Sequence, residues 1–129
     1  MKKKILLVAG GYSNEREISI LTAKSVFLEL KKNKKYNLKI TEPDGKFVKR
    51  LRLFKPDVVL NLLHGRYGED GYIQSILESE KIKYTHSGVK SSSIAIDKEL
   101  SKKIFIKNNI LTPKYIKFIF KKNIIKKSI

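Results

Sequence analysis

Short apolar runs alternate with longer amphipathic stretches along most of the chain. Residues 5–9 form a continuous apolar run, which is typical of a strand buried on both faces of a parallel sheet. The glycines at positions 10 and 11 then allow a sharp turn, and Asn14 is a good helix N-cap residue. The helix expected next has one face made of Ile18, Leu21, Ser25 and Leu28. Strand, glycine turn and helix in this order open a mononucleotide-binding fold.

The same alternation predicts further elements. Residues 36–41 alternate in the manner of a strand near a sheet edge, and a short amphipathic helix follows until Pro56 ends it. A third strand is expected over residues 57–63, in which residues 58–63 are the most apolar run of the chain, with Asn61 as the one polar member. A helix after residue 71 and a short strand over residues 82–85 follow. These elements predict an α/β fold with a parallel sheet of about four to five strands and flanking helices.

The last third of the chain has a different character. One helix is expected from Ser91 to about residue 108, with Asp97 and Lys98 inside it. The residue before Pro113 avoids the helical region, so an extended link leads to a strand over residues 115–120. The lysine-rich residues 121–129 offer this strand no evident partner. We therefore expect an unpaired apolar edge and self-association of the isolated chain.

Length and composition limit the class of protein. A chain of 129 residues is long enough for one domain with a real core and too short for two ordinary domains. The absence of cysteine excludes disulfides, thiolate metal sites and a cysteine nucleophile, and is compatible with a reducing cytoplasm. The apolar run behind the N-terminal lysines is too short for a signal peptide, and no later segment approaches a membrane span.

The formal net charge of +17 raises the question of nucleic-acid binding. The lysines, however, are spread along the whole chain and do not line one predicted helix. Arginine, which reads bases and phosphates bidentately, occurs only at positions 16, 50, 52 and 66. A dedicated nucleic-acid module is therefore the less favoured interpretation of the charge.

The turn after the first strand carries the first candidate chemistry. The dinucleotide fingerprint G-x-G-x-x-G is missing, and Glu15 and Glu17 stand where an anion-binding turn would have no acids, so a pyrophosphate ligand is not expected. An acid at the carboxyl end of a buried strand is placed to hold an amine. The alternative is that both acids only favour the positive N-terminus of the helix.

A second loop, residues 63–71, gathers three glycines around four ionisable residues: His64, Arg66, Glu69 and Asp70. A loop of this flexibility costs conformational entropy, which indicates a function. Asp70 is a plausible cap for the next helix. His64 is either a structural histidine or a functional one that faces the same crevice as Glu15.

Five stretches in this order resemble the N-terminal part of the D-alanine--D-alanine ligases, ATP-grasp enzymes of peptidoglycan precursor synthesis. They are GGYSNEREIS at 10–19, LHGRYGEDG at 63–71, YTHSG at 84–88, SSSIAIDK at 91–98 and LTP at 111–113. The resemblance implies a Rossmann-like, pre-ATP-grasp substrate-binding domain over residues 1–90. Residues 91–129 would then be a linker helix and the incomplete start of the central ATP-grasp domain.

The resemblance also implies roles for individual residues. Glu15 would hold the ammonium group of the first D-alanine, and His64 would orient this substrate and Glu15. Gly65 and Gly68 would let the loop backbone approach the substrate, and Lys98 would reach toward the nucleotide phosphates. No residue of this chain is implied as a metal ligand.

The implied activity is the ATP-dependent joining of two D-alanines in the cytoplasm by a homodimeric enzyme. ATP and Mg²⁺ would be bound mainly by domains absent from this chain, so the chain alone is expected to be inactive. Tyr12, Asn14, Tyr67 and His86 depart from the family pattern and make the shape of the subsite an open question. The alternatives are a ligase that uses D-lactate or D-serine as second substrate, and a stand-alone module that binds a small ligand or nucleic acid.

Overall fold

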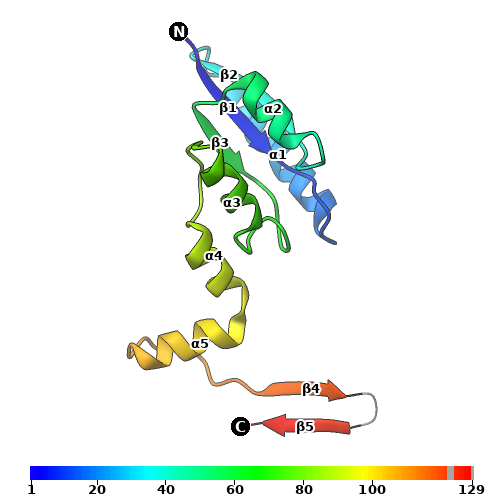
Figure 1. The fold of residues 1–129 in the computed structure, drawn as a ribbon, viewed down its shortest axis with the longest axis vertical. Coiled ribbons are helices and arrows are strands. Elements are labelled where there is room, and N and C mark those ends of the chain that lie inside the picture. The colour runs from blue at the N-terminus through cyan, green and yellow to red at the C-terminus, as the bar shows by residue number, and fades with distance from the viewer. Residues whose placement is uncertain (122–123, 129) are drawn as a thin grey trace. The chain divides into compact units, whose positions relative to one another are not determined.

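The computed structural model describes the backbone of residues 1–121 and 124–128 and the side chains of residues 1–118. The chain divides into two compact units, Met1–Ile96 and Asp97–Ile129, which are described separately (Figure 1). This structural boundary, after Ile96, lies six residues beyond residue 90, where we predict that the substrate-binding domain ends. The division into functional domains stays a prediction. Among the described residues, no helix combines the length and apolar character needed to cross a membrane.

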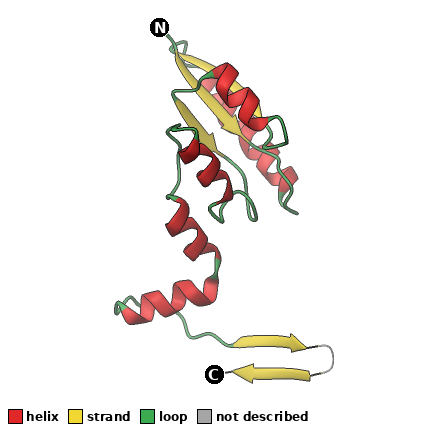
Figure 2. Cartoon of the chain, in the orientation of Figure 1, coloured by secondary structure: helices red, strands yellow, loops and turns green. Residues whose placement is uncertain are grey.

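The first unit is built on a parallel three-stranded sheet with the order β2-β1-β3 (Figure 2). Its strands are β1 (Lys3–Val8), β2 (Tyr36–Thr41) and β3 (Val58–Asn61). The central strand β1 has a partner on each side, so that Leu7 lies between Ile40 and Leu60. This position explains its continuous apolar sequence and confirms the predicted α/β class.

The sheet has fewer strands than expected. Residues 82–85 form only a single parallel bridge, between Val59 and Tyr84. Val59 donates to the Lys83 carbonyl at 2.8 Å and accepts from the Thr85 amide at 3.0 Å. The Tyr84 hydroxyl donates to Glu78 at 2.6 Å, and burial together with this hydrogen bond raises the pKa of Tyr84 to about 12. The segment is thus fixed to the sheet, but it is too short to count as a strand.

Four helices accompany the sheet: α1 (Arg16–Lys31), α2 (Phe47–Phe54), α3 (Tyr72–Ser79) and α4 (Val89–Ile96). The buried core consists of residues from β1 and β3 with residues from α2, the loop after β3 and α3: Leu6, Val8, Val59, Phe47, Leu51, Leu63, Ile73 and Leu77. Successive strand residues point to opposite faces, so Leu7 faces away from this core. The connection from β1 to β2, which contains α1, and the connection from β2 to β3, which contains α2, run in opposite directions across the sheet. Right-handed connections in opposite directions place their helices on opposite faces of the sheet.

Helix α1 does not bury the face that the sequence predicts. The expected face is exposed, since Ile18, Leu21 and Leu28 have exposed fractions of 56%, 58% and 65%. The buried positions are Ser19 and Ala23, which lie on the opposite side at 100° per residue and are small enough for close approach to the sheet. The predicted cap was also wrong, because the helix begins after Glu15 and has no side-chain capping bond there.

The second unit contains one helix, α5 (Lys98–Lys107), and two antiparallel strands, β4 (Lys117–Lys121) and β5 (Ile124–Ser128). Asp97 caps α5 by accepting the Leu100 amide at 2.9 Å, so the single helix expected from Ser91 is divided here into α4 and α5. The prediction of an unpaired final strand was wrong, because β4 pairs with β5. Lysine does not prevent this, since ladder hydrogen bonds use the backbone.

Glu99 pairs with Lys103 within α5, at 2.6 Å, and with Lys117, which connects α5 to β4. The hydrogen bonds from Lys103 and then Lys117 lower the pKa of Glu99 to about 2. A depressed carboxyl pKa stabilises the folded state above the ordinary value of 4.5, and this contribution is lost as the pH falls toward 2. We therefore expect the amide of Lys117 to become less protected from exchange over this interval, as followed by NMR. Glu99→Gln should remove this pH dependence, and identical curves for both proteins would contradict the prediction.

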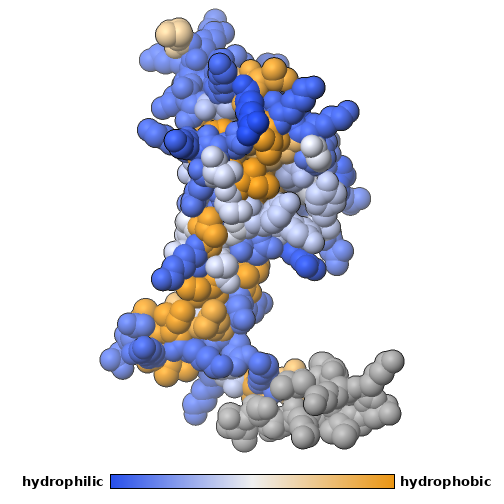
Figure 3. Space-filling model, viewed as in Figure 1, coloured by the Kyte–Doolittle hydropathy of each residue, from blue (hydrophilic) through white to orange (hydrophobic). Residues whose placement is uncertain are grey.

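Hydrophilic side chains cover most of the visible face of the first unit, interrupted by apolar patches (Figure 3). Ion pairs between described residues include Arg50 with Asp44 at 2.6 Å and Arg52 with Glu80 at 2.6 Å. The Arg50 hydrogen bond lowers the pKa of Asp44, and the Arg52 hydrogen bond lowers that of Glu80. Arg16 also pairs with Glu42 at 2.6 Å, so three of the four arginines are engaged with acids of the first unit, which leaves them less suited to reading phosphates.

Candidate functional site

The loops after β1 and β3 lie side by side, because parallel strands end at the same edge of the sheet. Ser13 Oγ donates to the His64 carbonyl at 2.7 Å and directly joins the two loops. Ser19 Oγ, on α1, joins the two loops a second time: it accepts a hydrogen bond from the Gly10 amide at 2.9 Å and donates one to the Leu62 carbonyl at 2.7 Å. The structure thus brings together the two stretches that the sequence singles out.

An open cleft of about 500 Å³ lies between these loops, lined by Tyr12, Ser13, Asn14, Glu15, Arg66 and Tyr67. The Glu15 carboxylate reaches across to the second loop, where a β-carbon at position 65 would lie 2.5 Å from its Oε2. Gly65 also has a φ of +68°, which favours glycine, and its amide donates to Glu69 Oε2 at 3.0 Å. An exposed carboxylate in such a cleft can accept hydrogen bonds from a small cationic group.

The side chain of His64 is directed toward α1. Its Nε2 lies 3.2 Å from Thr22 Oγ1. The Thr22 hydroxyl donates to the Ile18 carbonyl at 3.0 Å, so its oxygen accepts and His64 Nε2 carries a hydrogen. Thr22 therefore fixes the ring orientation, a role that spacing along the sequence did not reveal.

Gly68 has a packing role in the structure. It is buried, and a β-carbon there would lie 2.4 Å from Leu63 Cβ. Its carbonyl accepts hydrogen bonds from two buried amides, Asn61 Nδ2 at 2.8 Å and Gln74 Nε2 at 3.0 Å. Asn61 Oδ1 also accepts the Leu63 amide at 3.2 Å. Asn61 and Gln74 thus hold the loop that carries His64, and the isolated polarity of Asn61 within an apolar run was the signal for it.

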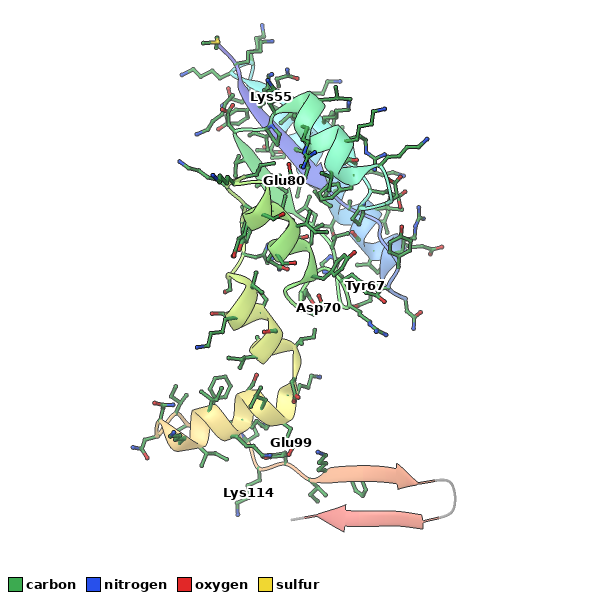
Figure 4. The ribbon with its side chains drawn as sticks, viewed as in Figure 1. Lys55, Tyr67, Asp70, Glu80, Glu99 and Lys114 are labelled. Atoms are coloured by element: carbon green, nitrogen blue, oxygen red, sulfur yellow. The ribbon has the colours of Figure 1, made fainter. Side chains whose placement is uncertain are left out.

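Aromatic contacts join the rim of the cleft. The ring of Tyr67 meets Tyr12 edge-on at 6.3 Å and Tyr72 at 5.4 Å between centroids, and the Arg66 guanidinium lies 5.0 Å above it. Asp70 accepts the Tyr67 amide at 2.8 Å and the Tyr72 amide at 3.0 Å, close to Tyr67 at the end of the unit (Figure 4). Asp70 thus satisfies the first amide of α3, but the N-cap itself is Gly71 and not Asp70 as expected.

Lys98 is exposed at the first position of α5, in the second unit, whereas Glu15, His64, Gly65 and Gly68 all belong to the first. Its role toward phosphates stays a prediction. Within the part of the chain that the structure describes, no three His, Cys, Asp or Glu side chains are placed together to hold a metal ion.

Comparison with known proteins gives a consistent result, although no family model matches the chain. A D-alanine--D-alanine ligase from Pelagibacter ubique is 64% identical over 123 residues, which cover 95% of this chain and 40% of the ligase. A D-alanine--D-alanine ligase from Zymomonas mobilis is 46% identical over 112 residues, covering 87% of this chain and 35% of that protein.

Solved structures agree with these sequence matches. The crystal structure of a D-alanine--D-alanine ligase from Bacillus anthracis complexed with ATP matches with a TM-score of 0.79 and 34% identity, over 96% of this chain and 42% of that one. The chain therefore spans about 40% of the length of the first curated relative that it matches. Over the region that it spans, the chain belongs to the D-alanine--D-alanine ligase family.

Proposed function

We propose that this chain supplies the first-substrate site of an enzyme that joins two D-alanines with the use of ATP. The observation that supports this most is the Glu15 carboxylate, which reaches Gly65 across a cleft formed by two loops. A carboxylate in that position suits the ammonium group of an amino acid, because both charge and hydrogen bonding are satisfied. His64, held by Thr22, would orient the substrate from the second loop.

By the same proposal, residues 1–90 bind the substrate and residues 91–129 begin the ATP-binding part of the ligase. Lys98 is the residue that would approach the nucleotide phosphates. ATP and Mg²⁺ would be held mainly by the parts of the ligase outside the matched region, which is 40% of the Pelagibacter ubique ligase. The protein would act in the cytoplasm.

The activity can be tested in a hybrid ligase, in which this chain replaces the matching 123 residues of the Pelagibacter ubique ligase. Phosphate release from ATP is expected to depend on D-alanine. Parallel assays with D-serine, which would form a dipeptide, and D-lactate, which would form a depsipeptide, as the second substrate would detect another specificity. A hybrid that folds and binds ATP but releases no phosphate with any of these substrates would overturn the proposal, provided that the native ligase is active in the same assay.

We also propose that the complete enzyme is a homodimer whose interface uses the outer face of α1, defined by Ile18, Leu21 and Leu28. These side chains are exposed on a helix whose opposite side is already packed against the sheet. Three large apolar residues on one face favour burial against another protein surface.

A charge in this face should weaken association. Leu21→Lys is expected to raise the dimer dissociation constant of the hybrid ligase by at least about tenfold, because an unpaired lysine resists burial. Leu53→Lys on α2 is the matched control, since Leu53 is exposed as well. Light scattering over a range of concentrations gives both constants, and equal values for the two variants would exclude α1 as the interface.

A further inference from the structure

A second cavity, of about 260 Å³, lies within the first unit and is not lined by Glu15 or His64. Its polar walls come from Glu69 in the glycine loop, Gln74 on α3 and His86 in the segment before α4. Ala95 and Ile96 of α4 supply an apolar wall. The space is several times the volume of one water molecule, about 30 Å³, and below that of a drug-sized pocket.

Gln74, which lines this cavity, carries an unused hydrogen-bond acceptor. Its side chain is fully buried, and its Nε2 donates to the Gly68 carbonyl at 3.0 Å. Its Oε1 has no hydrogen-bond partner among the described residues. Exchanging the two ends of the amide would set oxygen against the Gly68 carbonyl oxygen, so the observed orientation is the favourable one. A buried amide oxygen without a donor is rare in native proteins and indicates a missing partner.

The other polar groups of the cavity also favour a donor. His86 Nδ1 lies 3.0 Å from the Thr85 carbonyl, which can only accept, so Nδ1 carries a hydrogen, and in the tautomer that this contact selects Nε2 is the acceptor. Glu69 uses one carboxylate oxygen for the Gly65 amide, and its other oxygen is a further acceptor. Ser92 already donates its hydroxyl hydrogen to the Ser87 carbonyl at 3.0 Å.

His86 also has an unusual backbone. Its φ is +91°, a region that residues with a side chain rarely adopt. Such conformations persist where the surrounding structure holds them, and they are often found at binding sites. The residue whose imidazole lines the cavity is therefore held in place at a conformational cost.

We propose that this cavity binds a primary ammonium group that bears a short apolar substituent. An N–H of the ligand would donate to Gln74 Oε1, Glu69 would balance its charge, and the substituent would contact Ala95 and Ile96. A transition-metal ion fits poorly, because the described residues offer no group of three metal-binding side chains. The proposal concerns a cavity distinct from the Glu15 cleft and does not depend on ligase activity.

The test uses the 129-residue chain, labelled with ¹⁵N, and compares two cations by NMR. Methylammonium has N–H donors and tetramethylammonium has none, although both carry one positive charge. At matched ionic strength, methylammonium is expected to shift the Gln74 side-chain amide and the Ala95 backbone amide in a saturable manner, and tetramethylammonium is not. Equal responses to both cations, or no saturable response to methylammonium, would overturn the proposal.

Two variants test the contacts separately. Gln74→Met removes the acceptor and is expected to weaken methylammonium binding by about tenfold or more. Glu69→Gln changes an exposed residue, keeps an oxygen for the Gly65 amide and removes the charge, so it should fold normally and also weaken binding. Ser79→Ala, on the exposed side of α3, is the control. Unchanged affinity in folded Glu69→Gln, or a bound water at Gln74 that methylammonium does not displace, would contradict the site.

Discussion

Glu15→Gln in the hybrid ligase is expected to lower kcat/KM for D-alanine by about 10–100-fold, because a hydrogen bond between charged groups contributes about 1.5–3 kcal/mol. Glutamine keeps the size of the side chain and loses the charge that would attract an ammonium group. The KM for ATP should stay nearly constant, since the proposed contact is with the amino acid. Initial-rate kinetics with each substrate varied in turn separate the two effects.

Glu17→Gln is the matched control for this experiment. Glu17 is also an exposed acid in the first turn of α1, but it does not line the cleft between the loops. If both acids acted only on the helix N-terminus, the two variants would cost similar, small amounts of stability and leave kcat/KM for D-alanine unchanged. That outcome would remove Glu15 from the proposed site.

Gly68→Ala is expected to reduce the free energy of unfolding by about 1–3 kcal/mol, as overpacking of a filled interior usually does. The added methyl would lie 2.4 Å from Leu63 Cβ and 3.1 Å from the Leu63 carbonyl carbon. Backbone atoms cannot turn aside as a flexible side chain can. The loop must therefore shift, and the two amide hydrogen bonds to its carbonyl should weaken.

Denaturant unfolding of the chain measures this effect, with Gly45→Ala as the control. No atom lies within 4 Å of a β-carbon at position 45, and its backbone is not in the left-handed region. Alanine there should be neutral or slightly stabilising, since it restricts the unfolded chain. Equal losses in the two variants would show that the contact with Leu63 does not determine the requirement for glycine at position 68.

The elements with a clear apolar period were predictable from sequence. Residues 36–41 match β2 because they alternate as an edge strand does, and the spacing of Phe47 and Leu51 gives α2 because both residues are buried in the core. The crevice between the two loops was predictable too, since parallel strands that end at one edge must bring their following loops together.

Other features depend on partners that periodicity does not specify. The buried side of α1 is formed by Ser19 and Ala23. Their small side chains allow close approach to the sheet, which an apolar period in the sequence does not reveal. Asp97 resembles any polar helix residue until its carboxylate is seen to accept the Leu100 amide. Asn61 and Gln74 meet at the Gly68 carbonyl from two elements; the isolated polarity of Asn61 marks one of the two, but no local pattern specifies that it meets Gln74.

The strand order β2-β1-β3 also affects how the chain folds during its synthesis. The ribosome makes the central strand first, and β1 has no lasting partner until residues 36–41 and then 58–61 have emerged. Its apolar residues are exposed to water and to other nascent chains in that interval, since non-local parallel pairing forms slowly. Lys2, Lys3 and Lys4 place three like charges directly before these apolar residues, and such charges disfavour association with neighbouring nascent chains.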